Sequence, residues 1–329
     1  MRRTHLRSVL LTAAAAAVVV AVLPLHVAMA ETWPSRPIRL IVPFAPGGST
    51  DLTARQYANQ LSTRLGQPIV VENLGGANGT IGLSQLAKAK PDGYTLAVAS
   101  NGNTIINQFL YSKLPFDPMT DFVPIALLAE FTNILVVKSD SPLRSLQDLI
   151  AYGKANPGVV TYGSAGPGSS NHLGGYILMR QVGIEATHVP YKGSGPALVD
   201  VMAGNLMFMF DNVSTSLPHV QAGKLRVLAT AGKTRMKEFP DAPAVLEVVP
   251  GYESVGWHSL FGPKGMPDEV VKRLSREIAD IIRDKAFADR LALIGMDVKS
   301  STPDSLRARM VKEADALRPI MEESGIKID

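Results

Sequence analysis

The sequence predicts an α/β protein built from two lobes. Two stretches, residues 38–99 and 159–210, each alternate short apolar runs with segments whose apolar residues recur at helical spacing. Strand–helix–strand order with short connections is typical of parallel sheets that carry helices on their faces. Two further strand-like runs, residues 125–137 and 254–261, can cross between the lobes. We therefore expect two lobes joined by two crossover strands.

The first thirty residues have the order of parts of a secretory signal. Arginines precede the uncharged, mostly apolar run Val9–Ala30, which ends in the small-x-small site Ala28-Met29-Ala30. An uncleaved membrane anchor is the alternative, because about 20 apolar residues can span a bilayer. Pro24 and His26 interrupt the run, however. We expect residues 1–30 to be a signal peptide, cleaved after Ala30, and the mature protein to be soluble in the periplasm.

Composition excludes several classes of function. The 329-residue chain has no cysteine, so a disulfide framework, a thiolate nucleophile and a cysteine metal site are excluded. The formal net charge of +4 falls to about +1 once the three arginines of the signal segment are set aside. Basic and acidic residues are interleaved along the C-terminal segments, which argues against nucleic-acid binding. We expect a monomer without a cofactor.

Chain length predicts two domains after the signal segment, since about 100–200 residues form a typical domain. If both strand-like runs are crossovers, residues 136–253 form one α/β domain. Residues 31–135 together with 254–329 then form the other. Clefts between domains are favoured ligand sites, so we expect the ligand to bind between them.

The first strand and helix have clear sequence limits. Residues 38–44 are apolar, and Pro46-Gly47-Gly48 breaks the run. Ser49 or Thr50 can cap the helix that follows, and Gly66 ends it. The other elements expected before residue 100 are a strand at 69–71, a helix at 83–89 and a strand at 94–99.

The second set and the C-terminal helices follow the same rules. Gly183 and Gly204 end two helices, and Pro267 and Thr302-Pro303 begin helices that return to the first lobe. The elements expected in the second set are strands at 159–162, 186–189, 206–210 and 225–231, and helices at 172–182 and 197–203.

Two glycine-rich loops, Phe44–Asp51 and Gly163–His172, each join the end of a strand to the start of a helix. Helix N-termini carry free amide donors and a partial positive charge, so they attract anions. Ligands of open α/β sheets bind at the carboxyl ends of the strands. The second loop carries no formal charge, and we expect the two loops to face each other and hold a carboxylate. Asp51 either complements the helix dipole or receives an amino group of the ligand.

Other chemistries fit the second loop less well. A dinucleotide cradle would need G-x-G-x-x-G, but Asn171 stands where the last glycine belongs. An exported serine hydrolase using Ser169 or Ser170, with His172 nearby, is the main enzyme alternative, although the chain has no G-x-S-x-G elbow. The histidines form no i, i+4 pair, so we expect no metal site. A binding protein, not an enzyme, is the preferred interpretation.

Three more positions follow strands at the same edge of the predicted sheets. Asp211 comes after an apolar run and suits either a ligand contact or a turn. Asn101, with Gly102 and Asn103, follows the third strand, and Tyr191–Gly193 follows another.

Ordered motifs along residues 33–263 resemble the Bug/TctC family, periplasmic solute-binding proteins related to tripartite tricarboxylate transporters. After Asn73 the family often has Pro-Gly-Ala-Gly-Gly, whereas this chain has Leu74–Gly79, which leaves the contacts of that loop open. The matching segments are Trp33–Ile38, Val42–Asp51, Val71–Asn73, Ala89–Leu96, Tyr162–Ser169, Val189–Gly193, Gly223–Arg226 and the stretch around Trp257 and Pro263.

The resemblance implies a Venus-flytrap fold, the type II-like architecture of periplasmic binding proteins, and a carboxylated solute held with the help of water. The residues that it implies for the first-lobe grip are Phe44, Gly48, Ser49, Thr50 and Asp51. The residues that it implies for the second lobe are Ser164, Gly168, Ser169 and Ser170, with Asp211 lining the cleft. We add Asn101 as a further candidate for ligand contact.

We therefore expect an extracytoplasmic protein that captures a small carboxylate for uptake or sensing. The expected partners are the permease subunits of a tripartite tricarboxylate transporter, or a sensor protein. A scavenger without a permease is a third possibility. Amino acids, dicarboxylates, tricarboxylates and aromatic acids all remain open as ligands.

Overall fold

The computed structural model describes residues 33–252, 254–324 and 327 of the chain. The described residues from Arg36 onward form one compact unit. The predicted signal peptide, residues 1–30, lies outside the described residues. Within the described part, every helix is too short or too polar to cross a bilayer.

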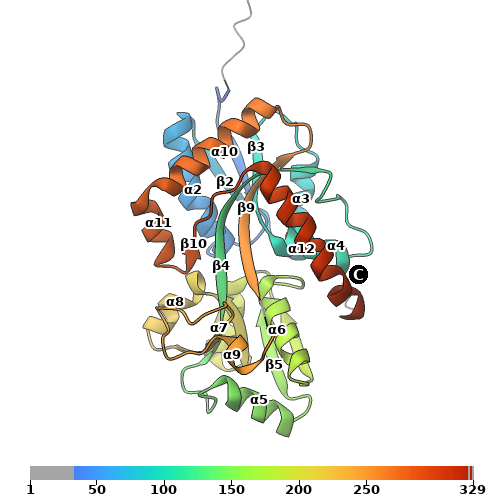
Figure 1. The fold of residues 1–329 in the computed structure, drawn as a ribbon, viewed down its shortest axis with the longest axis vertical. Coiled ribbons are helices and arrows are strands. Elements are labelled where there is room, and N and C mark those ends of the chain that lie inside the picture. Colours follow the sequence, from blue (N-terminus) through green and yellow to red (C-terminus); the bar gives the residue numbers. More distant parts are fainter. Residues whose placement is uncertain (1–32, 253, 325–326, 328–329) are drawn as a thin grey trace, which may run out of the picture. The chain divides into compact units, whose positions relative to one another are not determined.

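A mixed sheet forms the centre of the first lobe (Figure 1). Strand β1 (Ile38–Val42) pairs in parallel with β2 (Ile69–Asn73) and with β3 (Thr95–Ser100). Strand β9 (Val255–Pro263) runs antiparallel to β3. The helices of this lobe are α2 (Ser49–Leu65), α3 (Thr80–Ala87), α4 (Asn107–Leu110), α10 (Asp268–Arg283), α11 (Lys285–Ala292) and α12 (Pro303–Ser324).

Helix α2 shows how local sequence positions a functional segment. Ala54, Ala58 and Leu61 recur at helical spacing and are buried, so this face packs on the sheet. The helix ends at Gly66, whose φ of 69° lies in the left-handed region that glycine adopts readily. Because the helix begins at Ser49, shortly after β1, its first turn lies at the carboxyl end of the parallel strands.

A second sheet forms the centre of the other lobe. Strand β5 (Val160–Ser164) pairs in parallel with β6 (Ala186–Pro190) and β7 (Phe208–Asn212). Strand β8 (Leu225–Thr230) lies in the same sheet. The helices of this lobe are α5 (Leu146–Ala155), α6 (Ser170–Gln181), α7 (Ser194–Ala203), α8 (Val213–Gln221) and α9 (Val245–Val248).

Strand β4 (Phe122–Lys138) runs through both sheets (Figure 1). Its first part pairs antiparallel with β9 and with the short β10 (Met296–Asp297), and its second part pairs antiparallel with β7 and β8. The predicted fold of two α/β lobes joined by crossing strands is confirmed. The domain limits at residues 135/136 and 253/254 stay predictions.

Residues 134–137 of β4 are all apolar because both faces of the strand are buried there. Leu135 and Val137 pack into one hydrophobic cluster, whereas Ile134 and Val136 pack into another. Successive side chains of a strand point to opposite faces, so the two clusters lie on the two sides of the sheet. The sheet is therefore covered on both faces and leaves its strand ends for the cleft.

Three helix starts at the candidate site differ from the sequence-based expectations, and α3, expected at 83–89, also begins earlier, at Thr80. The helix expected from residue 172 begins at Ser170, and the one expected from residue 197 begins at Ser194. No helix is expected after Asn212, yet α8 begins at Val213. Pro218 lies inside α8 and obscures its pattern. All three helix starts lie at the candidate site.

Candidate functional site

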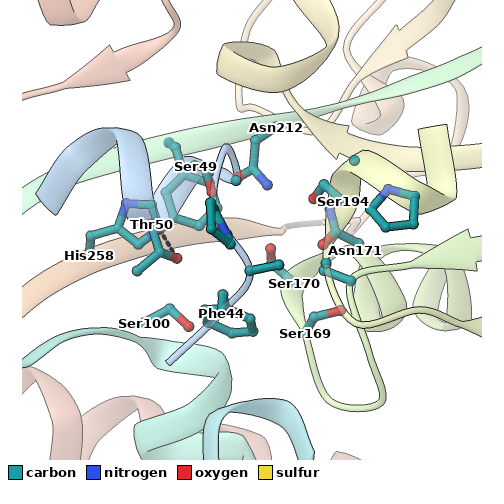
Figure 2. A pocket seen from close by; sticks show the side chains of 18 residues that line it. Phe44, Ser49, Thr50, Ser100, Ser169, Ser170, Asn171, Ser194, Asn212 and His258 are labelled. Carbon is teal, nitrogen blue, oxygen red and sulfur yellow. Dashed lines mark hydrogen bonds between the residues drawn. The ribbon is translucent and has the colours of Figure 1, made fainter. Parts of the chain in front are cut away.

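Both glycine-rich loops line one pocket between the lobes, here named the cleft pocket (Figure 2). The two crossing strands supply one residue each. The residues that line the cleft pocket are Phe44–Pro46, Gly48–Thr50, Ser100, Phe131, Ala165, Ser169–Asn171, Gly193–Pro196, Asn212 and His258.

The first loop brings the N-terminus of α2 to the cleft pocket. The chain turns at Gly47, where φ is 82°, and Gly48 occupies the N-cap position without a capping side chain. Ser49 and Thr50, which begin the helix, are only 7 % and 5 % exposed. The amides of this first turn have no partner within the helix, so a bound ligand can accept their hydrogen bonds.

The second loop brings the N-terminus of α6 to the same pocket. Ser169 caps this helix: its hydroxyl accepts from the amide of His172 at 3.3 Å and donates to the carbonyl oxygen of Gly166 at 2.7 Å. The side chain of Ser170 follows at the first helical position and is half-buried at the pocket. Ser169 thus fixes the loop, and Ser170 is the hydroxyl left for a ligand.

Helices α7 and α8 also begin at the cleft pocket. Their N-cap residues are Gly193 and Asn212, and neither side chain caps its helix. Ser194 and Asn212 are 5 % and 4 % exposed, so both helix ends are buried. A buried helix end without a cap leaves amide donors that need a partner.

The cleft pocket therefore attracts anions without a cation in its wall. Among the described residues that line it, none is Asp, Glu, Lys or Arg. The N-termini of α2, α6, α7 and α8 each carry a partial positive charge from the helix dipole. In a buried setting these dipoles and amides favour a carboxylate, and they impose no desolvation cost of a buried lysine or arginine.

The crossing strands place two rings in the wall of the pocket. Phe131 of β4 and His258 of β9 lie with ring centroids 4.5 Å apart. His258 Nε2 lies 3.2 Å from Thr50 Oγ1 (Figure 2). His258 Nδ1 lies 2.9 Å from Thr53 Oγ1. Burial lowers the pKa of His258 to about 3, so the ring is neutral at physiological pH.

The predicted site residues divide into two groups. Those that line the cleft pocket are Phe44, Gly48, Ser49, Thr50, Ser169 and Ser170. Those that lie outside its lining are Asp51, Asn101, Ser164, Gly168 and Asp211.

The carboxylate of Asp51 holds the first loop and the neighbouring strand. It accepts hydrogen bonds from the amide of Gly47 at 2.9 Å, from Arg55 at 3.0 Å and from Asn73 at 3.0 Å. Burial alone would raise its pKa, but these hydrogen bonds and the Arg55 charge hold the pKa below its usual value. Asp51 therefore stays ionised, and its carboxylate oxygens accept hydrogen bonds from the protein itself.

Asp211 is wholly buried beneath the starts of α7 and α8. Its carboxylate accepts from Ser216 at 2.6 Å, from the hydroxyls of Thr215 and Ser194, and from the backbone amide of Asn212. Burial raises the pKa of this carboxyl, and the hydrogen bonds oppose that effect. Its position links two helix starts of the pocket wall.

Ser164 and Gly168 fix the second loop from behind. The hydroxyl of Ser164 bonds with His188 Nε2 at 2.6 Å and accepts from the amide of Gly166 at 3.1 Å. Gly168 has a φ of 77°, and its amide donates to His172 Nδ1 at 3.0 Å. Asn101 is buried where β3 gives way to a π-helical turn.

A second pocket adjoins the first and shares Phe44, Ala165 and Pro196 with it. Its wall includes one cation, the exposed Lys192. The loop Leu74–Gly79, whose sequence differs from the pattern frequent in the family, also contributes to this pocket. Its Asn78 has a φ of 46°, and the side-chain amide of Asn78 donates to Asn107 Oδ1 at 2.7 Å. The other residues of this adjoining pocket are Gly76, Ala77, Gly79, Tyr111, Gly166, Pro167, Pro190 and Tyr191.

Sequence reasoning missed Ser194, Asn212 and His258 as pocket residues. A glycine followed by serine, as at Gly193-Ser194, is a weak helix-start signal that was available. Asn212 stands before an unpredicted helix, and nothing in a strand sequence marks His258. Within the described residues, no group of three or more His, Asp or Glu side chains could hold a metal ion.

Comparison with known proteins finds a match to one family model. Residues 53–326 match the model described as the tripartite tricarboxylate transporter family receptor.

Solved structures of similar proteins cover nearly all of the described chain. The periplasmic binding protein BugD is 32 % identical, with a TM-score of 0.86 over 90 % of this chain and 100 % of its own. Rpa4515 of R. palustris, solved with adipate, is 34 % identical with a TM-score of 0.87, and it covers 90 % and 100 % of the two chains. MatC of Rhodopseudomonas palustris, solved with malate, is 31 % identical with a TM-score of 0.83, covering 88 % and 100 %.

Proposed function

Because the chain belongs to the tripartite tricarboxylate transporter receptor family, we propose that it is an extracytoplasmic solute-binding protein whose lobes close on a small carboxylate. The similar proteins solved with adipate and with malate support an acid as the ligand. The cleft pocket is the proposed binding site. The predicted signal peptide, residues 1–30, would place the protein in the periplasm, where BugD is described.

The observation that carries this proposal is the convergence of uncapped, buried helix ends on an uncharged pocket. Gly48, Gly193 and Asn212 leave the first amides of α2, α7 and α8 without a side-chain cap. A carboxylate accepts several hydrogen bonds at once, and such charge-assisted bonds are the strong ones. An acid therefore satisfies donors that the protein itself leaves unpaired.

Contacts between the lobes support a closed arrangement around the ligand. A Cβ placed on Gly102 of the first lobe would lie 3.0 Å from the carbonyl oxygen of Gly168 in the second. A Cβ on Gly193 would lie 3.3 Å from that of Ala45 across the same cleft. A ligand that touches both sides stabilises this closed form over an open one, which is how binding drives closure.

The adjoining pocket suits the far end of a longer acid. It shares Phe44, Ala165 and Pro196 with the cleft pocket, and most of the residues in its wall are apolar or glycine. Lys192 stands in that wall and can pair with a second carboxylate. A dicarboxylate would then place one acid group on the helix ends and the other near Lys192.

A thermal-shift screen of carboxylic acids tests the proposed function. An acid at 100 times its dissociation constant adds about 2.7 kcal/mol to stability and raises the melting temperature. Malate, adipate, citrate, benzoate and glutamate span the candidate classes, and matched amines serve as controls. A screen in which no acid raises the melting temperature while amines do would refute a carboxylate ligand.

A serine hydrolase is less well supported by the contacts of the two serines. The hydroxyl of Ser169 is bonded to Gly166 as donor, and His172 Nδ1 accepts from the amide of Gly168. His172 Nδ1 is thus occupied by the amide of Gly168 and not by Ser170, whereas a general base must lie within hydrogen-bond reach of its nucleophile. Turnover of generic esters that is lost in Ser170→Ala would favour the hydrolase instead.

The proposed partners follow from the family description of a transporter receptor. Permease subunits in the membrane would bind the closed form and accept the solute. A sensor protein could read the same form, and a scavenger would need neither. Pull-down of the acid-loaded and acid-free protein with candidate membrane partners distinguishes these roles.

A further inference from the structure

The imidazole of His258 joins two threonines of α2, one inside the cleft pocket and one behind it. Nε2 faces Thr50 Oγ1 at 3.2 Å, and Thr50 lines the pocket. Nδ1 faces Thr53 Oγ1 at 2.9 Å, and Thr53 is fully buried behind the wall. The direction of these two hydrogen bonds decides what Thr50 presents to a ligand.

The hydroxyl of Thr53 donates its hydrogen bond to the backbone. It lies 2.9 Å from the carbonyl oxygen of Ser49 and 3.1 Å from the sulfur of Met296. A carbonyl oxygen and a thioether sulfur only accept hydrogen bonds. Thr53 therefore gives its proton to Ser49 and accepts one from His258 Nδ1.

This assignment fixes the tautomer of His258. The ring is buried and neutral, so it carries a single N–H, and the contact with Thr53 places that hydrogen on Nδ1. Nε2 is then an acceptor, and the proton that it accepts comes from Thr50. The hydroxyl of Thr50 is left with lone pairs only.

We propose that Thr50, oriented by His258, is a specificity-determining residue that presents an acceptor and so selects acids carrying a hydroxyl group near the bound carboxylate. The inference rests on the proposed function, because it concerns the same pocket. It adds a requirement that the helix ends do not impose. Amides grip the carboxylate, and Thr50 requires a donor beside it.

A second acceptor lies in the same wall. The side-chain oxygen of Asn212 is buried and has no hydrogen-bond partner among the described residues. A buried acceptor without a donor is costly, and a hydroxyl of the ligand can relieve it. The pocket thus offers lone pairs from α2 and from the start of α8.

A neutral hydroxyl fits these acceptors better than an ammonium group. The cleft pocket has helix N-termini around it, and these repel a positive charge. Its described lining includes no carboxylate that could pair with an ammonium. Hydroxy acids are therefore favoured over both plain acids and amino acids.

Matched acids test the proposal by titration calorimetry. The probes are both enantiomers of malate against succinate, both enantiomers of 2-hydroxyglutarate against glutarate, and aspartate as the amino counterpart. One hydroxy acid should bind roughly tenfold more tightly than its plain partner, since an unpaired buried acceptor costs about that factor. Aspartate should bind more weakly than the better malate enantiomer.

Variants locate the preference in Thr50 and in its orientation by His258. Thr50→Val removes the acceptor and should reduce the preference for the hydroxy acid to near unity. Thr53 lies outside the pocket. Thr53→Val removes the acceptor that holds the hydrogen of His258 on Nδ1, so this variant should also reduce the preference for the hydroxy acid. Thr53→Ser keeps the hydroxyl and should retain the preference, which separates positioning from damage to the fold.

The outcomes separate this proposal from the proposed function. Binding of none of these acids overturns the proposed selection of hydroxy acids, and the wider thermal-shift screen of carboxylic acids then decides on the proposed function. Equal binding of hydroxy and plain acids, or a preference that survives Thr50→Val, overturns the role of Thr50 alone. ¹⁵N spectra of labelled histidine in the wild-type protein give a ligand-free check: His258 should be the Nδ1–H tautomer, and an Nε2–H signal overturns the proposal.

Discussion

The ring of His172 stacks on the ring of His188 with centroids 3.9 Å apart. Each ring holds a different part of the second glycine-rich loop, Gly163–His172: His172 Nδ1 accepts from the amide of Gly168, and His188 Nε2 bonds with Ser164. Tyr162 flanks both rings. A loop that lines the cleft pocket therefore depends on two histidines that remain uncharged.

Stability should fall as the pH drops through the range in which free histidine titrates. Burial, aided by His188, lowers the pKa of His172 to about 3, and burial lowers that of His188 to about 4. Below pH 6.5 these histidines bind protons in the unfolded chain but not in the folded protein. The free energy of unfolding that is present above pH 6.5 is therefore lost as the pH falls toward 4. Each histidine then costs about 2 kcal/mol at pH 5. Urea unfolding from pH 7.5 to 4.5 measures this loss.

The variant His188→Gln should flatten that pH dependence. Glutamine keeps a polar contact for Ser164 but does not titrate, so the fall between pH 7 and pH 5 should shrink by about 2 kcal/mol. His219→Gln, which changes a histidine outside the ring stack, is the control. An unchanged slope in His188→Gln would argue that other groups dominate the acid response.

Adjacent serines of the second loop should separate stability from binding. Ser169→Ala removes the N-cap of α6 and should lower the free energy of unfolding by about 1 kcal/mol. Ser170→Ala removes a half-buried hydroxyl at the pocket and should leave stability nearly unchanged, while acid binding weakens several-fold. Denaturant unfolding and calorimetry on both variants check this, and equal stability losses would contradict it.

The sequence allowed the two lobes and their crossing strands to be predicted because those features are written in local patterns. The run that became β4 is apolar on both faces, and glycines such as Gly66 mark helix ends. The two loops were also predictable, since Gly47 and Gly48 stand between a strand and a helix. These signals need no knowledge of distant residues.

The rest of the site depends on pairing between segments far apart in the chain. His258 enters the pocket because β9 pairs with β3 in a register that sets it opposite Ser100. Its threonine partners come from α2, about 200 residues earlier. Asp51 and Asp211 look like ligand contacts from their positions after strands, but their orientation is set by Arg55 and by the hydroxyls around Ser216. Local sequence cannot give such orientations.

Lys192 should discriminate between dicarboxylates and monocarboxylates. It is the cation in the wall of the adjoining pocket, where the far end of a longer acid would lie. Lys192→Met should weaken adipate binding several-fold and leave hexanoate unchanged, since hexanoate lacks the second carboxylate. Lys224→Met removes the same charge outside both pockets and is the control. Equal effects on adipate and hexanoate would rule out a charge contact.

Gly102→Ala should hinder closure of the lobes without disturbing either lobe. Alanine adopts the backbone conformation of Gly102, but its methyl group would lie 3.0 Å from the carbonyl oxygen of Gly168 and 3.5 Å from the Cα of Ser169. These contacts exist only when the lobes meet, so the ligand must work against them. We expect acid affinity to fall roughly tenfold, about 1.4 kcal/mol, while the melting temperature of the acid-free protein stays the same.

Calorimetry and small-angle scattering measure the two sides of the Gly102→Ala prediction. The wild-type protein should become more compact when acid is added, and the variant should need more acid to do so. Val199→Ala, an exposed change on α7, controls for a general loss of stability. If Gly102→Ala binds and compacts like the wild type, the contact between Gly102 and Gly168 does not belong to the ligand-bound state, and closure must proceed through other surfaces of the lobes.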